Sequence, residues 1–128
     1  MDLKFYLCQH CKNLITKIHD AGVPVVCCGE KMQELIPNTT EAANEKHLPV
    51  AEMQDDKLTV TVGSVEHPMT EEHYIQWICV QTETGYQLKH LTPTSRPVAT
   101  FLLGDEQPVA VFAYCNLHGL WKTDLKKF

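Results

Sequence analysis

The first 36 residues contain four of the six cysteines of this chain, as Cys8-x-x-Cys11 and then the adjacent pair Cys27 and Cys28. A segment this short buries too little apolar surface to fold well alone, and adjacent cysteines do not easily form a relaxed disulfide with each other. Four thiolates from two clustered pairs can instead surround one tetrahedral ion, and soft sulfur ligands favour zinc or iron. The spacing therefore predicts a small metal-stapled unit, with zinc and iron both open.

The length and charge of the chain narrow the remaining possibilities. Its 128 residues allow one ordinary domain, or one domain plus a small appendage. The net charge of −5 argues against nucleic acid or an anionic membrane as the main partner. We find no apolar run typical of a signal peptide or a membrane span, so we expect a cytoplasmic protein. In that reducing compartment, clustered cysteines favour metal or redox chemistry over disulfides.

A polar segment at residues 36–45, IPNTTEAANE, has no clear hydrophobic period and has a proline at its second position. It is typical of a linker or a crossover loop. We therefore expect two domains, residues 1–36 and 37–128. The one helix-like pattern is weak and lies at residues 30–35.

After the linker the pattern is mostly β. Segments rich in β-branched and aromatic residues alternate with turn residues, and several show apolar–polar alternation, at residues 57–65, 73–82, 85–91, 98–103 and 109–115. Short strands at this spacing predict an antiparallel sandwich, so the expected fold class is mainly β.

The second part also carries a second group of candidate ligands. These are four of the seven histidines and one cysteine, at strand ends or in loops: His47, His67, His73, Cys115 and His118. A single histidine is more often an ordinary surface or core residue, and Cys115-x-x-His118 alone could be half of a zinc knuckle. Together, five donors are too many for a closed tetrahedral zinc site. They suit a five-coordinate iron with one open position.

Five motifs in order, Cys8-x-x-Cys11, Cys27-Cys28, Glu45-Lys46-His47, His67-x5-His73 and Cys115-x-x-His118, resemble those of desulfoferrodoxins, the two-iron superoxide reductases. The resemblance covers essentially the whole chain. It implies a desulforedoxin-like domain at residues 1–36 and a neelaredoxin-like, immunoglobulin-like β-sandwich at residues 37–128.

The resemblance also implies roles for individual residues. The first iron would be bound by four thiolates, from Cys8, Cys11, Cys27 and Cys28. The second would have four equatorial histidines and an axial cysteine: His47, His67, His73, His118 and Cys115. Glu45 is similar to the glutamate that can occupy the open position of the oxidised iron, and Lys46 to the lysine that attracts superoxide and helps organise proton delivery.

The activity implied is one-electron reduction of superoxide to hydrogen peroxide, a detoxification reaction. A rubredoxin-like donor would return the electron, and the protein would be a homodimer. Two other classes stay open on the residues alone: a non-catalytic iron–thiolate electron carrier, and a zinc-stapled binding module. The other candidates have ordinary explanations. We expect His10, His19 and His90 to be exposed, Cys79 to be a small core thiol, and Tyr74, Trp77 and Phe112 to be core residues rather than a redox relay.

Overall fold

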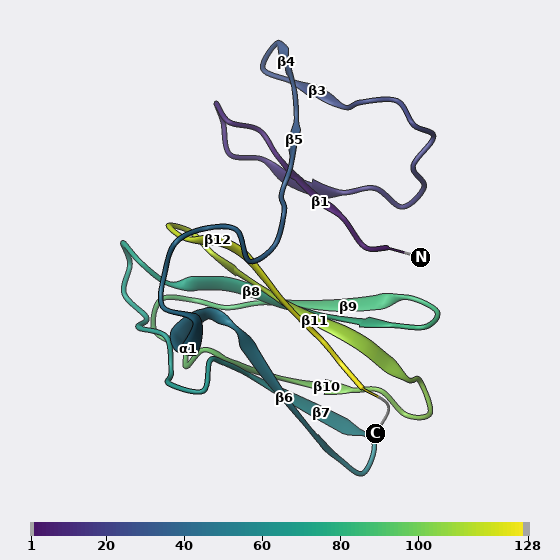
Figure 1. Cartoon of the computed structure of the whole chain (residues 1–128), viewed down its shortest axis with the longest axis vertical. Coiled ribbons are helices and arrows are strands. Elements are labelled where there is room, and N and C mark those ends of the chain that lie inside the picture. Colours follow the sequence, from purple (N-terminus) through teal and green to yellow (C-terminus); the bar gives the residue numbers. More distant parts are fainter. Residues whose placement is uncertain (1, 127–128) are drawn as a thin grey trace. The chain divides into compact units, whose positions relative to one another are not determined.

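The structure, a computed structural model, describes residues 2–126. The chain separates into two compact units, Met1–Ile36 and Pro37–Phe128 (Figure 1). Within residues 2–126, no helix is both long and apolar enough to cross a membrane.

The first unit is built from very short strands. Strand β1 (Phe5–Leu7) lies between β2 (Leu14–Thr16) and β5 (Gln33–Glu34), and a separate hairpin joins β3 (Val26–Cys27) to β4 (Glu30–Lys31). The helix-like pattern at residues 30–35 was wrong, because β4 and β5 occupy that segment. Six residues are too few to sustain a helix alone. The Met32 and Leu35 N–H groups instead donate to the carbonyls of Val25 and Phe5, at 2.8 Å each.

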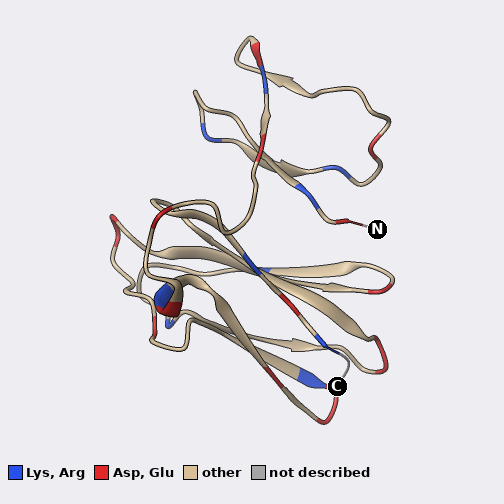
Figure 2. Cartoon of the chain, viewed as in Figure 1, with Lys and Arg blue, Asp and Glu red and all other residues tan. Residues whose placement is uncertain are grey.

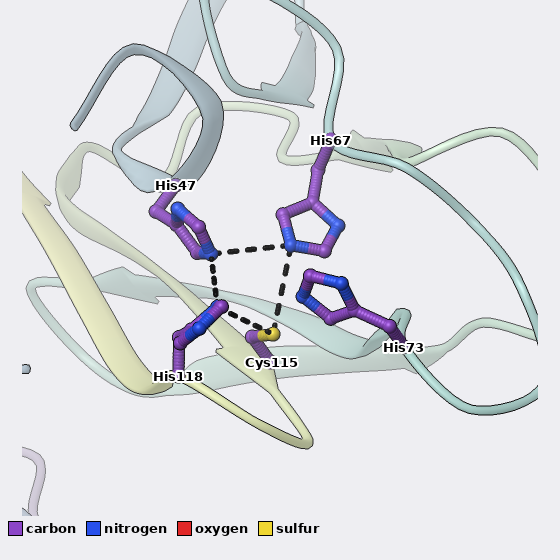
Figure 3. A group of neighbouring side chains, drawn as sticks. All are labelled: His47, His67, His73, Cys115 and His118. Carbon is purple, nitrogen blue, oxygen red and sulfur yellow. Dashed lines mark hydrogen bonds between the residues drawn. The ribbon is translucent and has the colours of Figure 1, made fainter. Parts of the chain in front are cut away.

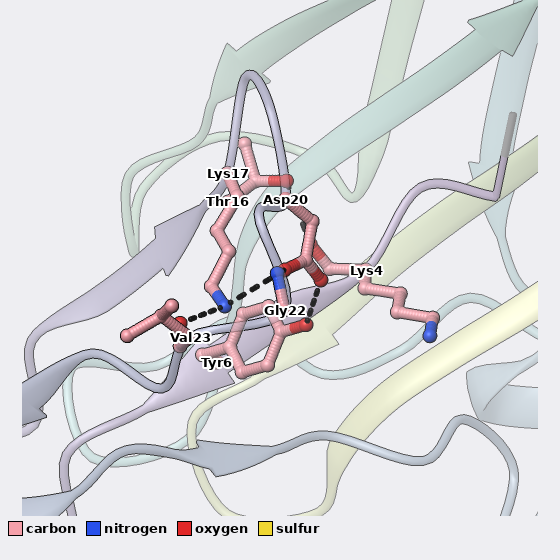
Figure 4. Close-up of polar contacts among 7 residues, drawn as sticks. All are labelled: Lys4, Tyr6, Thr16, Lys17, Asp20, Gly22 and Val23. Atoms are coloured by element: carbon pink, nitrogen blue, oxygen red, sulfur yellow. Dashed lines mark hydrogen bonds and ion pairs between the residues drawn. The ribbon is translucent and has the colours of Figure 1, made fainter.

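A polar network organises the loop that separates the two cysteine pairs (Figure 4). The Lys17 ammonium donates to the Val23 carbonyl at 2.9 Å and to the Asp20 carboxylate at 3.3 Å, and it lies 4.9 Å from the centre of the Tyr6 ring. The Asp20 carboxylate also accepts the Gly22 N–H at 2.8 Å, and this bond, helped by Lys17, lowers the pKa of Asp20. Hydrogen bonds therefore hold this loop where apolar burial is scarce.

The second unit is a sandwich of two antiparallel sheets. One sheet has the order β10-β7-β6 and the other the order β12-β11-β8-β9. Their strands are β6 (Pro49–Gln54), β7 (Lys57–Val62), β8 (Ile75–Thr82), β9 (Tyr86–His90), β10 (Val98–Leu102), β11 (Pro108–Cys115) and β12 (Gly119–Asp124). Three strands facing four in an antiparallel arrangement is the immunoglobulin-like plan. The expected mainly β fold is confirmed.

The apolar core lies between these two sheets. Strand β7 alternates strictly, with Leu58, Val60 and Val62 buried and their neighbours less so. The same core takes Phe101 from β10 and Val111 from β11. Strands β8 and β11 are buried on both faces over most of their length, so their sequences read as nearly continuous apolar runs.

The five expected strands all appear, with ends shifted by up to three residues, but β6 and β12 were missed. Strand β6 begins at Pro49, and β12 ends in the charged run after Trp121, so neither has a clean apolar period. Helix α1 (Asn44–His47) is the one helix found among residues 2–126, and it begins within the segment expected to be a linker. A single turn without a side-chain cap gives no periodic signal.

Candidate metal centres

The first centre is a group of four cysteines, Cys8, Cys11, Cys27 and Cys28, whose sulfur atoms all lie within 4.8 Å of one another. Cys8 follows β1 and is buried, whereas Cys27 ends β3 and is half-buried. Cys11 and Cys28 are exposed. Two short turns thus bring both cysteine pairs to one point.

The turn after Cys8 has the geometry that supports a thiolate. The Cys11 N–H donates to the Cys8 sulfur at 3.5 Å, and the Lys12 N–H donates to the Cys8 carbonyl at 3.0 Å. Closing this turn places Lys12 in the left-handed region, with φ of 67°. Cys28 also has a positive φ, of 52°, which is uncommon for a residue with a side chain.

The four thiols do not favour ionisation together. The Cys11 N–H lowers the pKa of Cys8 to about 6, whereas hydrogen bonding to Cys11 and Cys8 raises the pKa of Cys28 to about 12. One negative charge is therefore accommodated, and further charges oppose one another. Four thiolates at this spacing require a cation among them, so the group fits a thiolate-bound metal.

The second centre combines four imidazoles and one thiol, from His47, His67, His73, Cys115 and His118, with ligand atoms again within 4.8 Å of one another. The four rings form a closed cycle in the order 47, 67, 73, 118, with neighbouring centroids 4.6 to 5.0 Å apart and neighbouring planes 79 to 84° apart. The Cys115 sulfur lies 3.5 Å from His67 Nε2 and 4.0 Å from His118 Nδ1 (Figure 3). The rings thus surround one point.

Separate elements of the sandwich carry these ligands. His47 ends α1, and His67 lies in the loop after β7. His73 lies just before β8, where Thr70 and His73 exchange backbone hydrogen bonds of 2.9 and 3.2 Å. Cys115 ends β11, and His118 lies in the turn that leads to β12. Gly119, with φ of 76°, pairs with Cys115 and provides the left-handed residue that closes this three-residue hairpin loop.

The ring nitrogens show which atoms face the centre. His47 Nδ1 is bonded to the Ala43 carbonyl at 2.8 Å and His67 Nδ1 to the Pro68 carbonyl at 2.6 Å, so both present Nε2 inward. His118 presents Nδ1, which lies 3.1 Å from His47 Nε2. The Nε2 atom of His73 is buried without a hydrogen-bond partner among the described residues. Inward-facing nitrogens, one of them an orphan, fit a metal ion.

Burial favours the neutral, metal-binding form of three of the imidazoles. Loss of solvation lowers the pKa of His67 to about 4 and also lowers the pKa values of His47 and His73. Burial raises the pKa of Cys115, and the N–H groups of Leu117 and His118 oppose that change. Those N–H groups point at the sulfur and would stabilise its thiolate.

Three contacts fix the backbone near His47 and His67. A Cβ added to Gly63 would lie 2.5 Å from the Glu45 carbonyl oxygen, so the end of β7 packs directly against α1. The Val65 N–H donates to the same oxygen at 2.9 Å, and the His67 N–H donates to the Val62 carbonyl at 2.7 Å. The segment after β7 thus holds both ligands.

The other residues singled out from the sequence lie outside the two ligand groups. Glu45 and Lys46 are exposed on α1 beside His47, where Figure 2 shows adjacent acidic and basic positions on the short helix, and neither belongs to the ligand group. His10, His19 and His90 are exposed. Cys79 is buried, with its pKa raised to about 12 by burial. Trp77 and Phe112 are buried and Tyr74 is half-buried.

Sequence reasoning missed the residues that support the ligands. Gly63 and Asn116 lie in turns, where glycine and asparagine are common for local reasons. Arg96 pairs with Glu66 at 2.8 Å beside His67, although the two are 30 positions apart. The one available signal was the position of Asn116 between two candidate ligands.

Comparison with known proteins identifies close relatives. The desulfoferrodoxin family model matches residues 39–124. The desulfoferrodoxin of Syntrophotalea carbinolica is 44% identical over 122 residues, covering 95% of this chain and 96% of the relative.

Two solved structures are similar. The superoxide reductase of Treponema pallidum superposes with a TM-score of 0.82 at 40% identity, covering 97% of this chain and all of the other. The one-iron superoxide reductase of Giardia intestinalis gives a TM-score of 0.56 at 30% identity and covers 64% of this chain and 98% of the other.

Proposed function

Because this chain belongs to the desulfoferrodoxin family, we propose that it is a superoxide reductase that converts superoxide to hydrogen peroxide at the second centre. Proteins that carry that name are similar to it over nearly their whole length. The observation that carries the proposal is the closed cycle of four imidazoles with the Cys115 thiol beside it. Such a donor set suits iron with one position left for a small ligand.

We propose that iron occupies this centre through His47, His67, His73, His118 and Cys115. When bound, the iron supplies one electron to superoxide, and solvent supplies the two protons of hydrogen peroxide. The protein's part is to hold the four imidazoles around one point and to direct the N–H groups of Leu117 and His118 at the Cys115 sulfur. A thiolate from Cys115 would donate electron density to that iron, which would favour release of the reduced product.

Glu45 and Lys46 are proposed to act from α1. Both are exposed and precede His47 directly, so the helix that positions a ligand also presents one cation and one carboxylate near it. Lys46 would attract the superoxide anion to an otherwise acidic protein and help to deliver protons. Glu45 would occupy the open position of the oxidised metal.

The first centre is proposed to hold a second iron, bound by Cys8, Cys11, Cys27 and Cys28. A rubredoxin-like protein would return the electron after each turnover. A homodimer, on the family resemblance, and a cytoplasmic location complete the proposal. Sedimentation of the purified protein would test the dimer.

Replacing the thiolate tests the proposed activity directly. We expect Cys115→Ser to abolish superoxide reduction while leaving the absorption of the four-cysteine centre intact, because a serine hydroxyl is a poorer ligand. The measurement is rapid mixing of the reduced protein with a pulse of superoxide. Turnover at the parent rate would contradict the assignment. A parent protein with two ferric thiolate spectra but no reaction with superoxide would be an electron carrier, and one without visible absorption would be the zinc module.

The role of Lys46 has its own test. A unit charge roughly 10 Å from the approaching anion would change the encounter rate by about two- to twentyfold, depending on the effective dielectric. Lys46→Ala should therefore lower the second-order rate within that range and flatten its dependence on salt. Lys57→Ala, at an exposed lysine that opens β7, is the matched control. An unchanged rate and slope at low ionic strength would remove Lys46 from the mechanism.

A further inference from the structure

The four histidines of the second centre are not held in the same way. His47 and His67 each have a ring nitrogen bonded to a nearby carbonyl, which fixes the ring itself. The Nε2 atom of His73 faces the centre and has no partner among the described residues, so no protein group bonded to that nitrogen fixes the ring. The backbone on either side of His73 therefore contributes to the position of the ring.

Asn116 holds that backbone from the opposite hairpin. Its side-chain carbonyl accepts the Tyr74 N–H at 3.0 Å, and its side-chain amide donates to the Glu72 carbonyl at 2.9 Å. Its own backbone N–H donates to the Tyr74 carbonyl at 3.3 Å. The three bonds grip the residues immediately before and after His73, more than 40 positions away in the sequence.

Asn116 is also the residue that follows Cys115 and lies in the turn that carries His118. One asparagine thus joins the hairpin that supplies two ligands to the segment that supplies a third. The local turn formed by Thr70 and His73 shapes that segment but does not tie it to the hairpin.

We propose that Asn116 is a positioning residue of the second centre, a cross-link that sets His73 against Cys115 and His118. It does not contact the reacting atoms. This inference rests on the proposed metal site, because it concerns how the ligands are held toward the ion. Loss of such supporting hydrogen bonds weakens metal binding by about 10- to 100-fold in comparable sites.

The chain contains a matched control in Asn38. Its side chain accepts the Lys122 N–H at 2.8 Å and donates to the Lys122 carbonyl at 3.0 Å, and its backbone N–H donates to the Leu120 carbonyl at 3.0 Å. The chemistry and number of bonds are the same, but neither bonded residue adjoins a ligand. Asn38 also has φ of 65°, so Asn38→Ala adds backbone strain and should destabilise the unit at least as much.

The experiment compares Asn116→Ala, Asn38→Ala and the parent as full-length, iron-loaded proteins. The measurements are the rate at which a chelator removes ferrous iron from the second centre, the thiolate-to-iron absorption of the oxidised centre, and the thermal unfolding midpoint. We expect Asn116→Ala to lose iron about 10- to 100-fold faster and to shift the absorption band. Asn38→Ala should keep the parent absorption and stay within about twofold of the parent rate, although its unfolding midpoint falls.

If Asn116→Ala does not fold, Asn116→Asp serves in its place, because it keeps the acceptor for Tyr74 and loses only the donor to Glu72. Faster iron loss and a shifted band in this variant support the proposal. Iron loss no faster than in Asn38→Ala, in whichever Asn116 variant folds, overturns it. A parent without thiolate absorption at the second centre would instead contradict the proposed function itself.

Discussion

The two units of this chain hold their candidate metal centres by opposite means. Among the described residues of the first unit, Phe5 and Cys8 alone are buried, and one of them is itself a candidate ligand. The second unit has a continuous apolar core between two sheets. We therefore expect the first unit to fold only when its cysteines bind a metal. The second unit folds around its apolar core, which brings its candidate ligands together without a metal.

The ligand sets differ in the same way. The four cysteines of the first centre lie on two neighbouring turns, and one backbone N–H already lowers the pKa of one thiol. The five candidate ligands of the second centre come from α1, two loops and the end of β11, and they meet only when both sheets are in place. We therefore expect a metal to be needed for the fold of the first unit but not for that of the second.

Removing a ligand from the first centre should give the largest effect. We expect Cys28→Ser to release or weaken the first metal and to unfold residues 2–36, because that segment lacks a core of its own. Residues 37–126 should remain folded, and the second centre should still react with superoxide in a single turnover. Amide hydrogen exchange, read separately for each unit, measures both outcomes. Loss of both metal signals together would show that the units are not independent.

Acid should destabilise the second unit of the metal-free protein. The pKa of His67 is about 4 in the fold against an ordinary value of 6.5, so the unfolded chain binds more protons between these values. Stability is therefore retained above pH 6.5 and falls as the pH drops toward 4, by on the order of 3 kcal/mol from His67 alone. The lowered pKa values of His47 and His73 act in the same direction.

Urea unfolding followed by circular dichroism at several pH values measures this loss. His67→Leu, which cannot titrate, should flatten the profile between pH 6.5 and 4. An unchanged slope in that variant would mean that other groups cause the acid sensitivity.

A methyl group at Gly63 should disturb the contact between α1 and the segment after β7, beside the second centre. Its Cβ would lie 2.5 Å from the Glu45 carbonyl oxygen and 2.9 Å from that of Leu48, and backbone atoms cannot rotate away. We expect Gly63→Ala to cost about 1–3 kcal/mol and to alter the absorption of the second centre as α1 shifts. Gly85→Ala, with nothing within 4 Å of its added Cβ, should change stability by less than about 0.5 kcal/mol. Equal effects of the two variants would show that α1 does not depend on this contact.

The smallest effect should be a gain in the first unit. Lys12 has φ of 67°, which glycine adopts without strain, so Lys12→Gly should stabilise the cysteine turn by up to about 1 kcal/mol. Lys31→Gly on β4 should do the reverse, because glycine weakens a strand. The denaturant concentration at which half of the first metal is released measures the stability of both variants. A loss of stability in Lys12→Gly would mean that the Lys12 side-chain bond to the Gln9 carbonyl outweighs the strain.

The sequence predicted most of what depends on residue type and spacing. Cysteine pairs and histidines at strand ends marked the candidate ligands, and alternating apolar residues predicted the sandwich, because these signals are local. Strand β7 illustrates this, since Leu58, Val60 and Val62 alternate in the sequence as they do in burial.

The residues that hold the ligand-bearing segments in place were not predictable, because their contacts are with residues distant in the sequence. Nothing near Gly63 in the sequence shows that the Glu45 carbonyl lies against it, and an asparagine in a turn such as Asn116 is ordinary until Glu72 and Tyr74 are placed beside it. Helix α1 is a single turn, too short for a period. It is held by contacts between the Glu45 carbonyl and the segment after β7, and those contacts exist only in the folded protein.

Trp121 gives the second centre a built-in optical reporter. Its indole is 1% exposed, lies with its ring centre 4.9 Å from that of His47, and donates its N–H to the His118 carbonyl at 3.0 Å. The chain has two tryptophans, and the other, Trp77, stacks on Tyr114 in the same sheet. An iron ion among the imidazoles would accept excitation energy from Trp121, so emission at this residue should fall as the centre fills. Filling and emptying of the centre can then be followed by tryptophan fluorescence, without an added dye.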